Sequence, residues 1–255
     1  MLLATDIGNT NIVIGGIKED KIIFQARIAT DYIKTSDQYG VEIRNILSLF
    51  NIKPEEINGC IISSVVPHVF NSVKTGLIKV INKEPVIIGP GIKTGLNVQT
   101  DNPTQVGSDR ITIAVGALIK YKPPLILIDF GTATTIDVVE EGNKYIGGCI
   151  LPGVKISLDA LTSRTAQLPS ICLDKPKKLI GKNTIDCMKS GIMYGTACMI
   201  DGLIERFKEE LNKEVTVVST GGLAKFITPL CKSKMNLEKD LLLEGLNSIY
   251  KKNIT

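Results

Sequence analysis

Residues 3–10 read LATDIGNT, and residues 127–132 repeat the pattern as LIDFGT. In both stretches a short apolar run ends in an aspartate, and a glycine stands two positions after that aspartate. The two aspartates, Asp6 and Asp129, lie 123 positions apart in the chain. Internal repetition of this kind predicts a fold built from two related halves.

The elements predicted around each copy follow the same order. Each copy begins a run of three short strands, at residues 2–5, 11–17, 21–28 and at 125–129, 134–140, 144–150. Helices are predicted at 41–50, 67–81, 107–119, 156–161, 184–211, after 222 and from about 240, and further strands at 60–66, 85–88 and 215–219. We therefore predict a duplicated α/β fold, with two βββαβα-type halves at residues 1–115 and 116–255 around a nucleotide cleft.

The composition is that of an ordinary globular protein. The chain has 255 residues, 44% of them hydrophobic, with 30 Lys and Arg against 26 Asp and Glu. Nucleic-acid-binding proteins typically carry a basic stripe interleaved with aromatic residues, and the positive charges of this chain form no such stripe. No apolar segment is long enough for a membrane span, and the first residues lack the basic region of a signal peptide. We expect a cytoplasmic protein without a nucleic-acid or membrane partner.

Cysteine and histidine are too sparse for the common metal and redox motifs. The six cysteines are never closer than 11 residues to one another, so the chain has no C-x-x-C pair. They are predicted to be buried free thiols. His68 is the only histidine, and its position after Pro67 favours a place at a helix entry over a catalytic role.

The turn after Asp6 has the residues that a phosphate-binding loop needs. Gly8 permits close approach of a ligand, and Thr10 and Asn11 add a hydroxyl and an amide to the backbone N–H groups. Because a carboxylate repels bare phosphate, Asp6 suits this site only if Mg²⁺ or its water shell lies between them. A single turn of this kind is better explained as a tight hairpin, but the second copy at 129–135 favours two turns that hold the β- and γ-phosphates.

The segment Gly107-Ser108-Asp109-Arg110 leaves two interpretations open. Ser108 as N-cap and Asp109 in the first turn are ordinary features of a helix start. Alternatively, Asp109 accepts the proton of a substrate hydroxyl and Arg110 holds an anionic group. A helix N-terminus would lower the pKa of Asp109 and suits late proton transfer in a loose phosphoryl-transfer transition state.

Two further glycine-rich segments, 147–153 and 221–222, are either anion-binding turns or plain connections. In the helix at 184–211, the small residues Gly191, Gly195, Ala197 and Gly202 permit tight helix packing, within the chain or across a dimer interface.

Taken together and in this order, residues 6–10, 107–110, 129–135 and 147–153 resemble the motifs of the type III pantothenate kinases. This family belongs to the actin-like (ribonuclease H-like) superfamily of acetate and sugar kinases, and the resemblance runs the whole length of the chain. It implies ATP-dependent phosphorylation of pantothenate to 4′-phosphopantothenate, the first step of coenzyme A biosynthesis. It also implies a homodimer that needs Mg²⁺ and a monovalent cation, K⁺ or NH₄⁺.

The resemblance further implies roles for single residues. Asp109 is the implied general base, Asp129 the ligand of the monovalent cation, and Thr184 a pantothenate contact near the dimer interface. The pantothenate site is implied at Gly107, Ser108, Asp109 and Arg110. The residues implied to bind ATP are Asp6, Ile7, Gly8, Asn9, Thr10, Asn11, Ile12, Val13 and Thr132. Of these, Asp6 is also implied to lie near Mg²⁺. Many relatives have tyrosine where this chain has Thr100, so the contribution of Thr100 stays open.

Two alternative functions remain. Another small-molecule kinase of the superfamily would keep both phosphate turns and change the acceptor pocket. A nucleotide-binding regulator would keep the site without catalysis, although the presence of Asp6, Asp109 and Asp129 argues against it.

Overall fold

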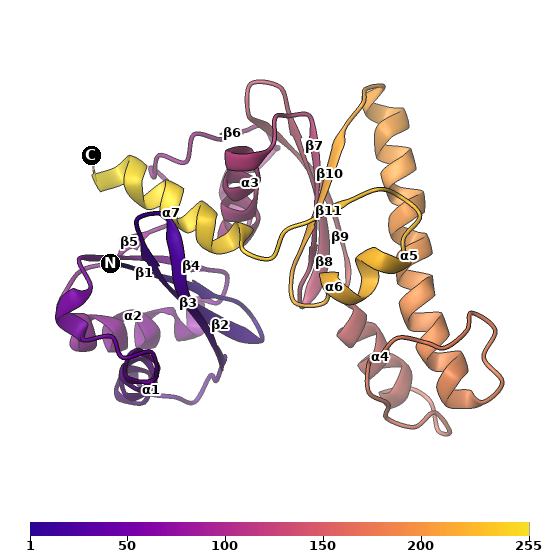
Figure 1. Ribbon diagram of the computed structural model, residues 1–255, viewed down its shortest axis with the longest axis horizontal. Coiled ribbons are helices and arrows are strands. Elements are labelled where there is room, and N and C mark those ends of the chain that lie inside the picture. The colour runs from indigo at the N-terminus through magenta and orange to yellow at the C-terminus, as the bar shows by residue number, and fades with distance from the viewer. Residues whose placement is uncertain (255) are drawn as a thin grey trace. The chain divides into compact units, whose positions relative to one another are not determined.

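The computed structural model describes residues 1–254, and the chain divides into two compact units (Figure 1). Unit 1 comprises Met1–Leu96, Asp101–Lys120 and the chain from Asp240 onward, and unit 2 comprises Asn97–Thr100 and Tyr121–Lys239. This division differs from the predicted halves at 1–115 and 116–255. Residue 115 lies inside a helix that stays whole in unit 1, and the last helix of the chain returns to unit 1.

Unit 1 is built on a five-stranded sheet in the order β3-β2-β1-β4-β5. Its strands are β1 (Leu2–Ile7), β2 (Asn11–Lys18), β3 (Lys21–Ala29), β4 (Gly59–Ser64) and β5 (Val86–Ile87). Its helices are α1 (Ser36–Leu49), α2 (Pro67–Ile81), α3 (Ser108–Lys120) and α7 (Leu241–Ile254), with short 3₁₀ turns at Pro54–Glu56 and Pro103–Gln105. The first three strands are antiparallel neighbours, whereas β4 runs parallel to β1 and β5 parallel to β4.

Unit 2 is built on a six-stranded sheet in the order β11-β10-β7-β8-β9-β6. Its strands are β6 (Asn97–Val98), β7 (Leu125–Phe130), β8 (Ala133–Glu140), β9 (Lys144–Pro152), β10 (Thr216–Thr220) and β11 (Asn236–Leu237). Its helices are α4 (Val154–Ser163), α5 (Thr184–Leu211) and α6 (Ala224–Ile227), with a 3₁₀ turn at Thr228–Leu230.

The repeat seen in the sequence is present in the geometry. Strands β1, β2 and β3 have 6, 8 and 9 residues, and so do β7, β8 and β9. The pairing register shifts between Gly16 and Ile17 in β2 and at the equivalent place, between Val138 and Val139, in β8. The predicted duplication, in which each half begins with a run of three strands, is therefore confirmed.

Each unit has its own hydrophobic core. In unit 1, α1 and α2 contribute to one cluster of buried residues, and α3 and α7 contribute to a second. β1 is buried along its whole length, as its uninterrupted apolar run predicts. In unit 2, α5 packs against residues of β7, β8 and β10. The ends of the strands are thereby held at fixed positions within each unit.

Local signals explain several element boundaries. Thr35 and Gln38 form a capping box before α1, and Pro67 is the first residue of α2. Helix α2 ends at Ile81, and its C-cap Asn82 adopts the left-handed conformation that asparagine tolerates.

The six cysteines are free, but the prediction that they are buried is wrong for Cys172, Cys187 and Cys198, which are exposed. No helix within residues 1–254 is both long enough and apolar enough to cross a bilayer.

Candidate functional site

Unit 1 gathers polar side chains where β1 and β4 end and α3 begins. Asp6 is the fifth residue of β1, and its parallel neighbour in β4 is Ser63. Ser108 and Asp109 are the first two residues of α3. Ligands of open α/β sheets bind at the carboxyl ends of parallel strands, so this edge of the sheet is the expected place for a site.

Asp6 is a buried carboxyl group with one oxygen, Oδ1, that receives no hydrogen bond. Burial raises the pKa of Asp6 to about 7. A hydrogen bond from Ser63 opposes this rise, and the nearby charge of Asp109 adds to it. Asp6 and Asp109 are therefore close enough to interact electrostatically.

Ser108 joins α3 to the end of β4 through its hydroxyl group. Its Oγ accepts the backbone N–H of Ser64 at 3.1 Å and donates to the carbonyl oxygen of Ser64 at 2.9 Å. The hydroxyl of Ser63 lies 2.9 Å from the same Oγ. Since a hydroxyl carries one proton, Ser63 can donate to Ser108 or to Asp6 but not to both. The side chain of Ser108 thus fixes the start of α3 beside Asp6.

Asp109 is positioned by its own helix start. Its Oδ1 accepts the backbone N–H of Arg110 at 2.7 Å. A β-carbon on Gly107 would lie 2.4 Å from the same oxygen, so a residue with a side chain there would displace this carboxylate from its observed position. The segment starts α3, as the first interpretation predicts, but the hydroxyl of Ser108 binds Ser64 instead of capping the helix. Asp109 presents a half-buried carboxylate next to Asp6, and its role as a base stays a prediction.

The turn after β1 presents its main chain rather than its apolar side chains. The N–H of Gly8 donates to the carbonyl oxygen of Asn11 at 3.1 Å, which closes the turn. Asn9, Thr10 and Asn11 are exposed. Ile7 and Ile12 lie in the core with no exposed surface, and Val13 packs against the second core cluster of unit 1. A ligand could reach Ile7 and Ile12 only through their backbone.

The residues of unit 1 fit a cation whose other ligands are mostly water and phosphate oxygens. Within residues 1–254, no group of three or more His, Cys, Asp or Glu side chains could hold a metal ion. A buried carboxylate with an unpartnered oxygen, such as that of Asp6, gains from a nearby positive charge. Mg²⁺ is usually bound by one or two carboxylates together with water and phosphate oxygens, and Asp6 meets this requirement.

Unit 2 holds the second aspartate in the equivalent place. Asp129 is the fifth residue of β7, and its parallel neighbour in β10 is Thr220. Gly221 has φ +98°, and a β-carbon there would lie 2.3 Å from Oδ1 of Asp129. The backbone of Gly221 therefore packs directly against this carboxylate. Thr132 is exposed in the turn between β7 and β8.

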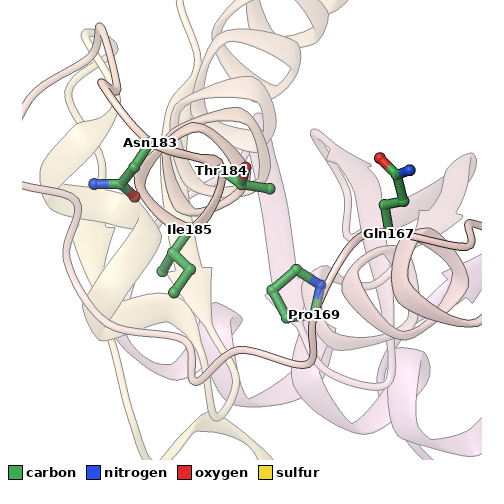
Figure 2. Close-up of a pocket in the computed structure, with 5 residues that line it drawn as sticks. All are labelled: Gln167, Pro169, Asn183, Thr184 and Ile185. Carbon is green, nitrogen blue, oxygen red and sulfur yellow. The ribbon is translucent and has the colours of Figure 1, made fainter.

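Thr184 lies apart from this aspartate turn in the sequence and lines a pocket of about 430 Å³ (Figure 2). Asn183, Thr184 and Ile185 contribute to the pocket from the start of α5, and Gln167 and Pro169 contribute from the segment between α4 and α5. Asn183 caps the helix by accepting the N–H of Asp186 at 2.9 Å.

Sequence reasoning missed Ser63 and Ser64. The available signal was two adjacent hydroxyl residues inside the otherwise apolar run 60–66, where β4 stops.

Comparison with known proteins identifies the family. A family model described as type III pantothenate kinase matches residues 2–206. The chain belongs to the type III pantothenate kinase family. Curated type III pantothenate kinases of two Exiguobacterium organisms, Exiguobacterium sp. (strain ATCC BAA-1283 / AT1b) and Exiguobacterium sibiricum, are each 44% identical to it over 253 residues. These matches cover 99% of this chain and 99% and 100% of the two relatives.

Solved structures support the fold. Component A of the (R)-2-hydroxyglutaryl-CoA dehydratase of Acidaminococcus fermentans is similar with a TM-score of 0.54 and 16% identity, over 98% of this chain and 96% of that one. A Sinorhizobium meliloti protein described as a 2-dehydro-3-deoxygalactonokinase is similar with a TM-score of 0.62 and 11% identity, over 98% and 96%. At these identities the likeness concerns the fold alone, and it confirms the duplicated actin-like architecture. As a member of the type III pantothenate kinase family, the chain is a phosphotransferase.

Proposed function

We propose that this chain is a cytoplasmic enzyme that transfers the γ-phosphoryl group of ATP to pantothenate and forms 4′-phosphopantothenate, the first step of coenzyme A biosynthesis. The single observation that carries the chemistry is the position of Asp109 in the first turn of α3, which Ser108 ties to the end of β4 beside Asp6. Membership of the type III pantothenate kinase family supports the substrate.

Asp109 is the proposed general base. Its carboxylate accepts the proton of the pantothenate hydroxyl while that oxygen forms a bond to the γ-phosphorus and the bond from this phosphorus to the ADP oxygen breaks. The backbone N–H of Arg110 holds the carboxylate of Asp109 by a hydrogen bond, and Gly107 has no side chain that would displace it. The guanidinium of Arg110 is a proposed contact for an anionic group of pantothenate. Thr184 is a proposed pantothenate contact near the dimer interface.

Asp6 is the proposed carboxylate next to Mg²⁺, and Asp129 the proposed ligand of K⁺ or NH₄⁺. When bound, Mg²⁺ neutralises charge on the phosphate oxygens. The main chain of residues 6–13 and the turn at Thr132 are the proposed ATP contacts, since backbone N–H groups of tight turns bind anions.

The deciding experiment is ADP release by the purified protein with ATP, Mg²⁺ and pantothenate, in KCl and in NaCl. We expect turnover that requires pantothenate and is much faster in KCl. Asp109→Asn should lose about a thousandfold or more in kcat while still binding ATP, because general base catalysis and positioning of the hydroxyl are both lost. Asp37→Asn, which changes an exposed carboxylate of α1, is the matched control and should keep wild-type kcat. Turnover of another acceptor in place of pantothenate would overturn the substrate assignment.

The homodimer is part of the same proposal, with α5 as the contact. Gly191 and Gly195 lie one turn apart, and a β-carbon on either would meet nothing within 4 Å. Cys187 and Cys198 are exposed and follow the same helical spacing. Such a stripe of small residues lets a helix of a second copy approach closely. Light scattering should show a dimer that Gly195→Lys dissociates and that Glu210→Lys, on another face of α5, leaves intact.

A further inference from the structure

Thr30 directly follows β3 and ties the end of that strand to the turn after β1. Its hydroxyl donates to the carbonyl oxygen of Gly8 at 2.6 Å, and its backbone N–H donates to the carbonyl oxygen of Thr10 at 3.0 Å. These two carbonyls lie on either side of Asn9. The main chain of the turn is therefore held by a residue about 20 positions away in the sequence.

These bonds determine where the N–H groups of the turn can point. In a trans peptide the carbonyl oxygen and the following N–H point in opposite directions. Since the carbonyl of Gly8 points at Thr30, the N–H of Asn9 points away from Thr30. Asn9 is exposed, so the turn is open to a ligand at this residue. Anion-binding turns need N–H groups that are oriented before the ligand arrives.

Thr30 is itself anchored to the core through its neighbour. The hydroxyl of Tyr39 accepts the N–H of Asp31 at 3.0 Å and donates to the carbonyl oxygen of Asp31 at 2.8 Å. Tyr39 belongs to α1 and has no exposed surface. The position of Thr30 therefore depends on a rigid buried side chain and not on the exposed loop that follows β3.

The repeat places a second brace at the equivalent position of unit 2. Gly153 directly follows β9, as Thr30 follows β3. A β-carbon on Gly153 would lie 2.0 Å from the carbonyl oxygen of Thr132 and 2.9 Å from that of Gly131. In both units, the residue after the third strand contacts carbonyl groups of the turn between the first two strands. Thr30 does so by hydrogen bonds in unit 1, and Gly153 does so by close backbone packing in unit 2.

We infer that Thr30 is a positioning residue for phosphate binding, which acts by holding the Gly8 and Thr10 carbonyls so that the N–H groups of the turn face the nucleotide. Gly153 has the corresponding role for the turn at Thr132. This inference rests on the proposed function only in taking a nucleotide phosphate as the ligand of the turn.

The test compares Thr30→Val with Thr30→Ser. Valine keeps the size and the branched shape of the side chain but removes the hydroxyl, and serine restores the hydroxyl. We expect Thr30→Val to raise the ATP KM and the ATP dissociation constant about tenfold, the effect of one lost hydrogen bond. The pantothenate KM should stay unchanged, and Thr30→Ser should return the ATP constants to within about twofold of wild type.

Thr35→Val is the matched control. Thr35 lies in the same connection and also uses its hydroxyl in a hydrogen bond, but that bond caps α1. This variant should lower the unfolding midpoint in urea without changing either KM, so a general loss of stability is distinguished from a lost orientation of the turn.

Equal ATP constants for wild type and Thr30→Val would overturn the inference while leaving the kinase activity established. If the wild type phosphorylates no acceptor, the proposed function fails separately, and ATP binding measured by calorimetry across the three Thr30 proteins still tests the inference. A fall in kcat with unchanged ATP affinity in Thr30→Val would also contradict it.

Discussion

Gly116 of α3 and Gly245 of α7 are reciprocal points of closest approach between their helices. A β-carbon on Gly116 would lie 2.1 Å from the carbonyl oxygen of Leu241, and one on Gly245 would lie 2.0 Å from the carbonyl oxygen of Thr112. Each contact is made by backbone, which cannot rotate away as a side chain can. The last helix of the chain is therefore held in unit 1 by two glycines.

Alanine at either glycine should destabilise the protein. Helix propensity alone predicts a gain of about 1 kcal/mol, but overpacking against a backbone carbonyl costs about 1–3 kcal/mol, so the steric term is expected to prevail. Urea unfolding of Gly116→Ala and Gly245→Ala measures the balance. Gly89→Ala, at an exposed position where a β-carbon meets nothing within 4 Å, is the control and should keep a midpoint close to that of wild type. A higher midpoint for Gly116→Ala would show that the two helices separate easily.

Asp6→Asn should stabilise the metal-free protein at pH 8. Burial raises the pKa of Asp6 from 3.8 to about 7 in the folded state. The cost of ionising it in the fold is absent below about pH 4, grows between pH 4 and 7, and is complete above pH 7, where it amounts to about a few kcal/mol. Asparagine avoids this cost, so the stability difference between variant and wild type should rise across that range. Urea unfolding at pH 4.5, 6 and 8 with chelator present measures it, and a difference independent of pH would mean that Asp6 is not desolvated.

Much of the fold could be predicted because its signals are local. The repeated aspartate turns predict the duplicated meander, Pro67 marks the first residue of α2, and the predicted bounds 184–211 are those of α5. The assignment of α7 to unit 1 could not be predicted, because an amphipathic pattern shows that one helix face is buried but not which sheet buries it. The strands β6 and β11 have only two residues each, too few to show alternation.

The site divides in the same way. Asp6, Asp109 and Asp129 stand in recognisable local motifs, and the sequence identifies them as candidates. Ser63 and Thr30 act on these motifs through contacts between segments that are far apart in the chain. Spacing within a segment carries no information about such contacts, so single-sequence reasoning could not find them.

Gly221→Ala should weaken activation by K⁺. At φ +98° an alanine is strained, and its β-carbon would displace Oδ1 of Asp129, the proposed cation ligand. A penalty of about 1–2 kcal/mol corresponds to a rise of roughly tenfold in the KCl concentration that gives half-maximal ADP release. Gly222→Ala is the matched control, since a β-carbon at this adjacent position meets nothing within 4 Å, and it should keep the wild-type KCl dependence. If Gly221→Ala lowers the rate equally at every KCl concentration, Asp129 does not bind the activating cation, and the glycine serves only to shape the end of β10.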